Sequence, residues 1–185
     1  TNCIRWGNKF VRRVIKMSEL DLSVDQTLDM TNIDPSKDGI DHIRINLNDT
    51  ATLLGERLFI DHTRVFYHPR YGSFISISAA VTWYKLKNKD ENIRSLCGAR
   101  LREYVDKQIK SGENEYEVKF IPDNLLEEFL VYSIMSKPDL LEMVMSNKLP
   151  YVAYYFDSDN KFKMRDKQMT RILNNIKPKL VDLNN

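Results

Sequence analysis

The sequence predicts a single domain of the α+β class, in which helices and short strands are mixed. Three observations predict it: a length of 185 residues, a hydrophobic content of 42%, and short stretches of alternating apolar residues separated by stretches of helical spacing. A chain of this length can bury a sizeable core, and strands separated by helices are typical of mixed domains. We expect residues 1–50 to form an N-terminal elaboration of helix, loop and strand, and residues 51–185 to form the main domain.

The first elements are predicted from their hydrophobic periodicity. Residues 3–17 carry apolar residues at helical spacing, and residues 23–39 are polar with turn dipeptides, which predicts a long loop. Apolar alternation predicts a strand at 40–47, and the strand-forming residues of LFIDHTRVFY predict another at 58–67. Leucines at helical spacing predict a helix within 48–58. The start of the chain is therefore predicted as helix, loop, strand, helix and strand.

The second half of the chain follows the stretch YGSFISISAAVTWYKL, residues 71–86, which predicts a turn, a short strand and a helix entered through serine. After it, periodicity predicts a helical run at 92–109 broken at Gly98 and a strand at 116–120, and two prolines predict helices that begin at Pro122 and Pro138. The last predicted elements are a strand at 149–156, a turn at 157–161 and a closing helix at 164–176. Strands thus alternate with helices along the chain, which is the basis of the α+β assignment.

The composition argues against several classes of protein. The 28 basic and 26 acidic side chains give a net charge of +2, which is too balanced to indicate nucleic-acid or membrane binding by bulk electrostatics. Cys3 and Cys97 lie far apart and predict neither a disulfide framework nor a zinc site, so we expect a reducing compartment. We find no signal-peptide pattern and no apolar run near the ~20 residues of a membrane span, and we expect a cytoplasmic protein.

Metal and cofactor motifs are weak in the sequence. His62 and His68 are six residues apart, which fits no spacing of ligands on a helix face, and we expect these histidines and His42 to be half-exposed strand and turn residues. Residues 157–160 begin like a calcium loop, but Phe162 stands at its glycine position. The sequence contains no glycine-rich phosphate loop. We therefore predict no metal and no cofactor.

The segment FYHPRYGSF, residues 66–74, has an unusual composition. It combines four aromatic residues, a histidine and an arginine around a proline and a glycine, directly before a predicted helix N-terminus. Helix N-termini attract anions, and an arginine beside one is typical of a phosphate or carboxylate contact. A packed turn with Arg70 at the surface explains the same composition, and both interpretations stay open.

The order of elements and the stretch from Gly72 to Leu86 resemble the NADAR superfamily of YbiA-like N-glycosidases, which act on ribose–nitrogen bonds. The family pattern places a glycine, an aromatic residue and a hydroxyl residue before a glutamate, then a helix that ends in an aromatic residue and Lys-Phe. The positions that match it are Gly72, Phe74, Ser76, Ile77, Tyr84 and Lys85. With weaker similarity at 131–156 and in the closing helix, the resemblance covers about residues 55–180.

This resemblance implies a NADAR-like domain with a pocket for an ADP-ribose or nucleotide-sugar ligand. It implies catalytic positions at Asp61, Ser78 and Lys85, and ligand-binding positions at Arg64, Arg70, Tyr71, Gly72 and Phe74. The family glutamate falls on Ser78, and a serine carries no charge to stabilise an oxocarbenium-like transition state. Either Asp61 takes that role, or the protein binds without cleaving. Lys85 either holds a phosphate or carboxylate as a point charge or is a solvated helix lysine.

Two functions from different classes therefore stay open, and a purely structural phage component is a third, weaker alternative. One is a protein that binds an ADP-ribose-like ligand, with or without N-glycosidase activity. The other is a catalytically inactive interaction protein that binds or neutralises a host factor, as in anti-defence or host takeover. The asparagine- and lysine-rich sequence resembles versions carried by large tailed bacteriophages, which implies a viral origin and the host cytoplasm. The missing glutamate favours the interaction protein, whereas Lys85 and the aromatic turn favour the ligand-binding protein.

Overall fold

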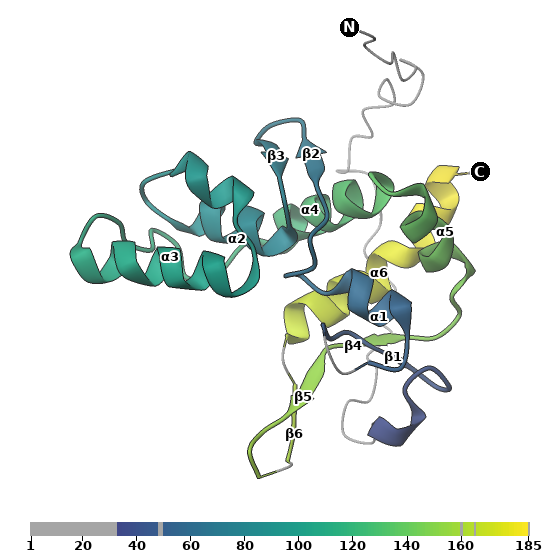
Figure 1. The fold of residues 1–185 in the computed structure, drawn as a ribbon. Helices are drawn as coiled ribbons and strands as arrows, with labels where there is room; N and C mark the ends of the chain where they lie inside the picture. The colour runs from purple at the N-terminus through teal and green to yellow at the C-terminus, as the bar shows by residue number, and fades with distance from the viewer. Residues whose placement is uncertain (1–32, 48–49, 160, 165, 185) are drawn as a thin grey trace, which may run out of the picture.

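The computed structural model describes residues 33–47, 50–159, 161–164 and 166–184 (Figure 1). Within these residues six α-helices are combined with three two-stranded sheets, an α+β architecture as predicted. The helix expected at 3–17, Cys3, and the first part of the loop expected at 23–39 lie outside the described residues. None of the described helices has the length and apolar character needed to cross a membrane.

The elements follow one another in this order: η2 (Pro35–Lys37), β1 (Ile43–Arg44), α1 (Leu53–Leu58), β2 (Phe66–His68), β3 (Gly72–Phe74), α2 (Ile77–Lys85), η3 (Glu91–Ser95), α3 (Gly98–Ser111), α4 (Asp123–Met135), α5 (Pro138–Ser146), β4 (Tyr151–Val152), β5 (Tyr154–Phe156), β6 (Phe162–Met164) and α6 (Lys167–Asn184).

The turn, strand and helix expected at 71–86 are confirmed. Strands β2 and β3 form an antiparallel hairpin in which Phe66 is opposite Phe74. Gly72 has a φ of +80°, a left-handed conformation that glycine adopts without the steric cost of a side chain. Ser76 then caps α2, because its Oγ accepts a hydrogen bond from the backbone N–H of Ala79 at 3.2 Å.

Parallel pairing connects distant parts of the chain. In the β1–β4 sheet, Ile43 is opposite Tyr151 and Arg44 is opposite Val152. Helix α6 packs against α4, α5 and β4. The β5–β6 hairpin follows β4 and projects downward from it in Figure 1. The N-terminal strand thus pairs with a strand from the last third of the chain.

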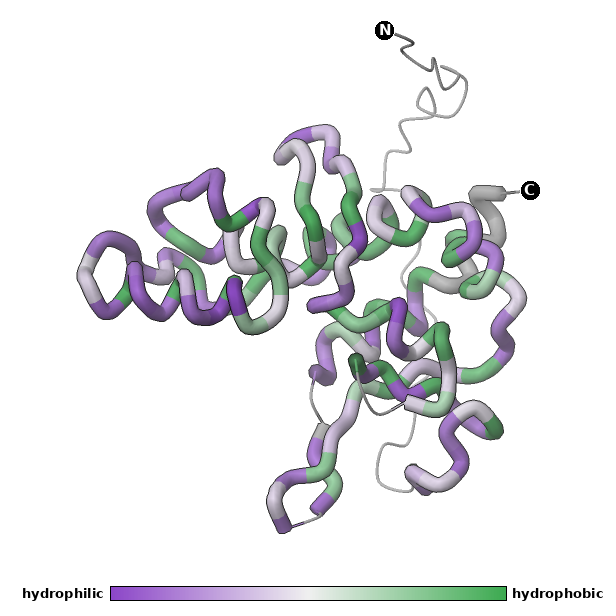
Figure 2. Tube along the Cα trace, viewed as in Figure 1, coloured by the Kyte–Doolittle hydropathy of each residue, from purple (hydrophilic) through white to green (hydrophobic). Residues whose placement is uncertain are grey.

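Helix α3 lies apart from this arrangement. It projects from the body beside η3, and Figure 2 shows hydrophilic residues along most of its length. Among its residues only Leu101 and Val105 are buried. The break expected at Gly98 is confirmed, because η3 ends at Ser95 and α3 begins at Gly98.

Three predicted strands are wrong or shorter than expected. The strand at 58–67 is confined to Phe66–His68, because earlier backbone groups bond elsewhere: Arg64 N–H donates to the carbonyl of Ile75 at 2.7 Å. The strand at 116–120 is replaced by irregular chain, because the N–H groups of Glu117 and Val118 both donate to the carbonyl of Lys85. The strand at 40–47 is reduced to Ile43–Arg44. The closing helix begins at Lys167, because the chain before it forms β6.

Candidate functional site

The loop that follows α1 meets the N-terminal end of α2. The backbone N–H of Ser78 donates to the carbonyl of Ile60 at 3.0 Å, and the N–H of Arg64 donates to the carbonyl of Ile75. The backbones of Asp61, Arg64 and Ser78 are therefore close to one junction. Lys85 lies at the other end of α2, about 10 Å further along the helix axis. The chain thus brings Asp61, Arg64 and Ser78 to one place and keeps Lys85 apart from them.

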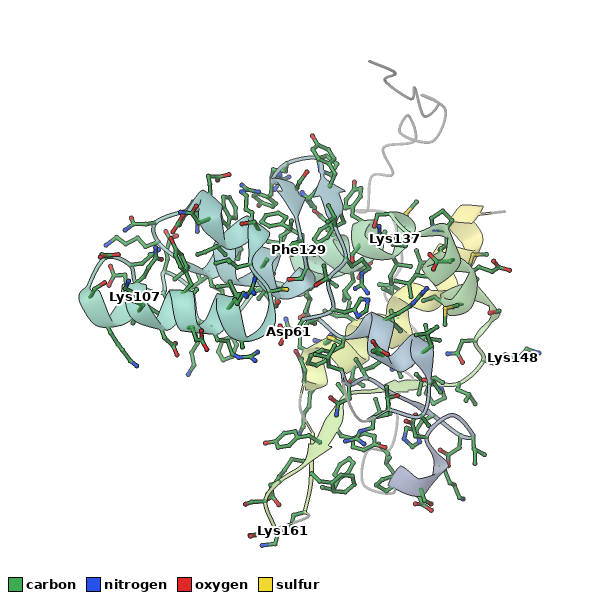
Figure 3. The ribbon with its side chains drawn as sticks, viewed as in Figure 1. Asp61, Lys107, Phe129, Lys137, Lys148 and Lys161 are labelled. Carbon is green, nitrogen blue, oxygen red and sulfur yellow. The ribbon has the colours of Figure 1, made fainter. Side chains whose placement is uncertain are left out.

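The carboxylate of Asp61 is held by helix α3. Its side chain is only 10% exposed, and Oδ2 accepts a hydrogen bond from Arg102 Nη1 at 2.9 Å (Figure 3). The Arg102 side chain is 62% exposed, so the ion pair lies at the surface edge of the junction. An acid that acts on a ligand has to face that ligand, and Asp61 instead faces Arg102.

Ser78 supports the start of its own helix. Its side chain is buried, and its Oγ lies 3.0 Å from the Oγ of Ser76, the residue that caps α2. Two serine hydroxyls in hydrogen-bond contact stabilise the helix entry without any ligand. The position that matches the family glutamate therefore has a structural partner in this chain.

Arg64 points into the protein. The residue is 3% exposed, its Nε donates to Ser133 Oγ of α4, and its Nη1 donates to the carbonyl of Arg57 in α1. Burial lowers the pKa of Arg64 to about 10, which leaves the guanidinium protonated at neutral pH. Arg64 thus joins α1 to α4 as a buried cation.

Tyr71 and Phe74 belong to an aromatic cluster. The ring of Tyr71 stacks on His68 at 5.0 Å, and Phe74 is 1% exposed. Phe129 of α4 lies at the centre, with ring centroids 5.8 Å from Phe74, 6.0 Å from Tyr71 and 6.2 Å from Phe66 (Figure 3). The cluster fastens the β2–β3 hairpin to α4.

His68 is a structural residue that the sequence did not identify. It is 2% exposed, its Nε2 donates to Glu128 Oε2 at 2.9 Å, and its Nδ1 faces the backbone N–H groups of Arg70 and Tyr71 at 3.2 and 3.3 Å. His42 is likewise 3% exposed, so the expectation of half-exposed histidines is wrong for both. Nε2 of each histidine meets a partner far along the chain, Glu128 for His68 and Tyr154 for His42, and spacing does not predict these contacts.

Arg70 and Gly72 occupy the turn of the hairpin. Gly72 supplies the left-handed backbone of this turn, and a β-carbon there would lie 3.5 Å from Arg94 Nη1. Arg70 is exposed, with its guanidinium 5.8 Å from the ring of Tyr71. Of the ligand-binding positions expected from the sequence, Arg70 alone presents a charge to solvent.

Two hollows in the described part of the chain lie outside the expected site residues. A shallow one of about 500 Å³ lies on α3 and is lined by Glu103, Asp106, Lys107, Lys110 and Ser111. A smaller one of about 150 Å³ is lined by Phe59, Ile60, Ala153, Asp166 and Met169. Sites that enclose a drug-sized molecule measure about 300–1000 Å³.

Among the described residues, no group of three or more His, Cys, Asp or Glu side chains is arranged to hold a metal.

Comparison with known proteins gives no relative: no family model, no curated protein and no solved structure matches the chain. The similarity to the NADAR superfamily stays a prediction that depends on the matching positions between Gly72 and Lys85.

Proposed function

We propose that the protein acts by binding a partner protein through one face of the β2–β3 hairpin, and that it does not cleave a glycosidic bond. The observation that carries this proposal is a group of exposed apolar side chains around β2 and the end of α4. We call this group the hairpin face, and it consists of Val65, Tyr67, Tyr132 and Met135.

The hairpin face follows from the alternation of side chains along β2. Phe66 and His68 point inward, which leaves Val65 and Tyr67 on the outer side, 56% and 62% exposed. Ser136 Oγ lies 3.3 Å from the carbonyl oxygen of Val65, so the residue before β2 lies beside the end of α4. There Tyr132, whose ring packs on His68, and Met135 are each 37% exposed. Gathered exposed apolar residues, with a tyrosine among them, are typical of protein interaction sites.

The charges around the hairpin face indicate the chemistry of the partner. Arg70 lies at the tip of the hairpin, and Lys137 is the second residue after α4; both are exposed. A hydrogen bond to Tyr71 and the charge of Glu128 raise the pKa of Arg70, which therefore stays a cation. Cations at the rim of an apolar surface attract an acidic partner and select against a basic one. The proposed partner is therefore an acidic protein surface, which in a bacteriophage setting belongs to a host protein.

The side chains expected to catalyse have other roles, which supports binding over cleavage. Asp61 is paired with Arg102, and Ser78 is bonded to Ser76. Lys85 lies at the opposite end of α2. Glycosidic cleavage needs a carboxylate beside the reacting carbon, and in this arrangement the nearest expected acid is already neutralised.

A substitution on the hairpin face tests the proposal. Tyr67→Ser removes an exposed ring without disturbing the core, so we expect the affinity for a captured and then purified partner to fall at least about tenfold, equal to 1.4 kcal/mol. Phe120→Ser is the matched control, because Phe120 is 70% exposed and lies in the irregular chain before α4. Partners are captured from bacterial lysate on immobilised protein, and affinity is measured by titration calorimetry. Equal affinities for the two variants contradict the proposal.

A second candidate function is the binding of an ADP-ribose-like ligand. The observation in its favour is that the 150 Å³ hollow adjoins the junction, since Ile60 both lines it and accepts the hydrogen bond from Ser78. A hollow of this size holds one ring or one small group, so the rest of such a ligand has to extend across the surface.

The second candidate predicts that ADP-ribose or NAD raises the Tm by about 2–4 °C for each kcal/mol of binding energy. It also predicts that Asp61→Asn abolishes any cleavage while lowering stability by no more than about 1 kcal/mol, because Arg102 is largely exposed. Arg102→Gln is the control, since it breaks the same ion pair and leaves the acid in place. No shift in Tm and no turnover with either nucleotide removes this candidate.

A further inference from the structure

Arg64 is a buried cation without a counter-ion. Its Nη2 is buried and has no hydrogen-bond partner, and none of the ion pairs among the described residues includes its guanidinium. Its two other bonds go to uncharged oxygens, one on Ser133 and one on the backbone of Arg57. Removing a charge from water without a counter-ion is costly, so a buried arginine normally faces a carboxylate or a bound anion.

A second arginine and a histidine lie near Arg64. His62, two residues earlier, has a lowered pKa because it is partly buried and because Arg64 and Arg57 repel a proton there, although Glu56 acts in the opposite direction. Arg57 reaches the cluster from α1 with a side chain that is 30% exposed. Arg57 of α1 thus lies close to Arg64 and His62 on the loop after α1, and the Arg57 side chain is partly exposed.

A carboxylate of α5 competes for Arg57. Asp139 forms an ion pair with Arg57 Nη1, and its own side chain is 62% exposed. The Arg57–Asp139 pair is therefore the outer boundary of the basic cluster, and it can open without disturbing the core.

We infer that Arg64, with Arg57 and His62, forms a binding site for an oxyanion such as a phosphate group. The oxyanion accepts a hydrogen bond from Nη2 of Arg64 and exchanges with Asp139 as the partner of Arg57. The planar guanidinium of arginine suits the oxygens of phosphate and carboxylate groups alike. This site is separate from the hairpin face, and it serves either a free anion or the phosphate of a larger ligand.

Thermal unfolding in sodium phosphate, compared with sodium chloride at equal ionic strength, tests the site. We expect phosphate about a hundredfold above its Kd to raise the Tm of the wild type by about 5–10 °C through binding. Phosphate also stabilises proteins in general by exclusion from their surface, so the specific effect is the difference between the wild type and Arg64→Met, which keeps the length of the side chain and removes its charge.

Two surface variants keep the test decisive where Arg64→Met fails to fold. Asp139→Asn removes the competing carboxylate and is expected to increase the phosphate shift, whereas Arg57→Gln is expected to decrease it. Acetate and ADP-ribose in place of phosphate then distinguish a carboxylate or a nucleotide from a free phosphate as the source. The inference is overturned when phosphate raises the Tm of the wild type, Asp139→Asn and Arg57→Gln equally, or when Arg64→Met folds and responds as the wild type does.

Discussion

Replacing Phe129 by alanine is expected to cost about 3–5 kcal/mol of the free energy of unfolding. Phe129 is fully buried, and its ring is in contact range of three other rings and of His68, at centroid distances of 5.2–6.2 Å. Alanine removes the central ring of the aromatic cluster and leaves a cavity that the surrounding hairpin and helices fill only partly. Urea denaturation at neutral pH measures the loss.

The same substitution is expected to loosen the β2–β3 hairpin before the rest of the protein unfolds. Hydrogen exchange should show the amides of residues 66–74 losing protection, because their contacts with α4 pass through Phe129. Phe120→Ala is the control, since an exposed side chain contributes within about 0.5 kcal/mol. If Phe129→Ala changes the free energy of unfolding by no more than about 0.5 kcal/mol, the aromatic cluster does not hold the hairpin.

Replacing Gly55 by alanine is expected to cost about 3 kcal/mol through steric overlap. Gly55 lies in α1, where a β-carbon would overlap the carbonyl oxygen of Arg44 and lie 2.6 Å from Thr50 Oγ1. Because that carbonyl belongs to β1, relief requires α1 to move away from the strand that pairs with β4. Alanine is otherwise favoured over glycine within a helix, so a loss of stability reports the overlap alone.

Gly112→Ala is the matched control for this prediction. Gly112 ends α3 with a φ of +76° and open space around its α-carbon, so alanine there costs about 1–2 kcal/mol of backbone strain without overlap. Chemical denaturation compares the two variants. A loss at Gly55 no larger than that at Gly112 contradicts the close packing of α1 on β1.

Local sequence signals predicted the helices better than the strands. The helix after Ser76 and the helix opened by Pro138 follow from capping residues and proline, which act within a few residues. The strand at 58–67 was predicted from β-branched and aromatic residues, but its backbone groups bond to the helix that follows. Strand formation depends on a distant partner, which composition does not reveal.

The sequence predicted which backbone positions of the candidate site lie together, but not the partners of their side chains. The resemblance placed Asp61, Arg64 and Ser78 in one site, and the chain does bring them to one junction. Their side chains point to different partners, since Asp61 bonds to a residue 41 positions later and Arg64 to one 69 positions later. Such contacts depend on the packing of α3 and α4, so spacing along the sequence cannot predict them.

Photo-crosslinking from position 67 tests most directly whether the hairpin face binds a partner. A photoreactive phenylalanine analogue replaces Tyr67 in one variant and Phe120 in another, and both are irradiated in bacterial lysate. The account predicts one discrete crosslinked product from position 67, identified by mass spectrometry as an acidic protein, that weakens strongly when Arg70→Glu is added to the same chain. The account is contradicted when position 67 gives no product beyond that seen from position 120, or when Arg70→Glu leaves the yield unchanged.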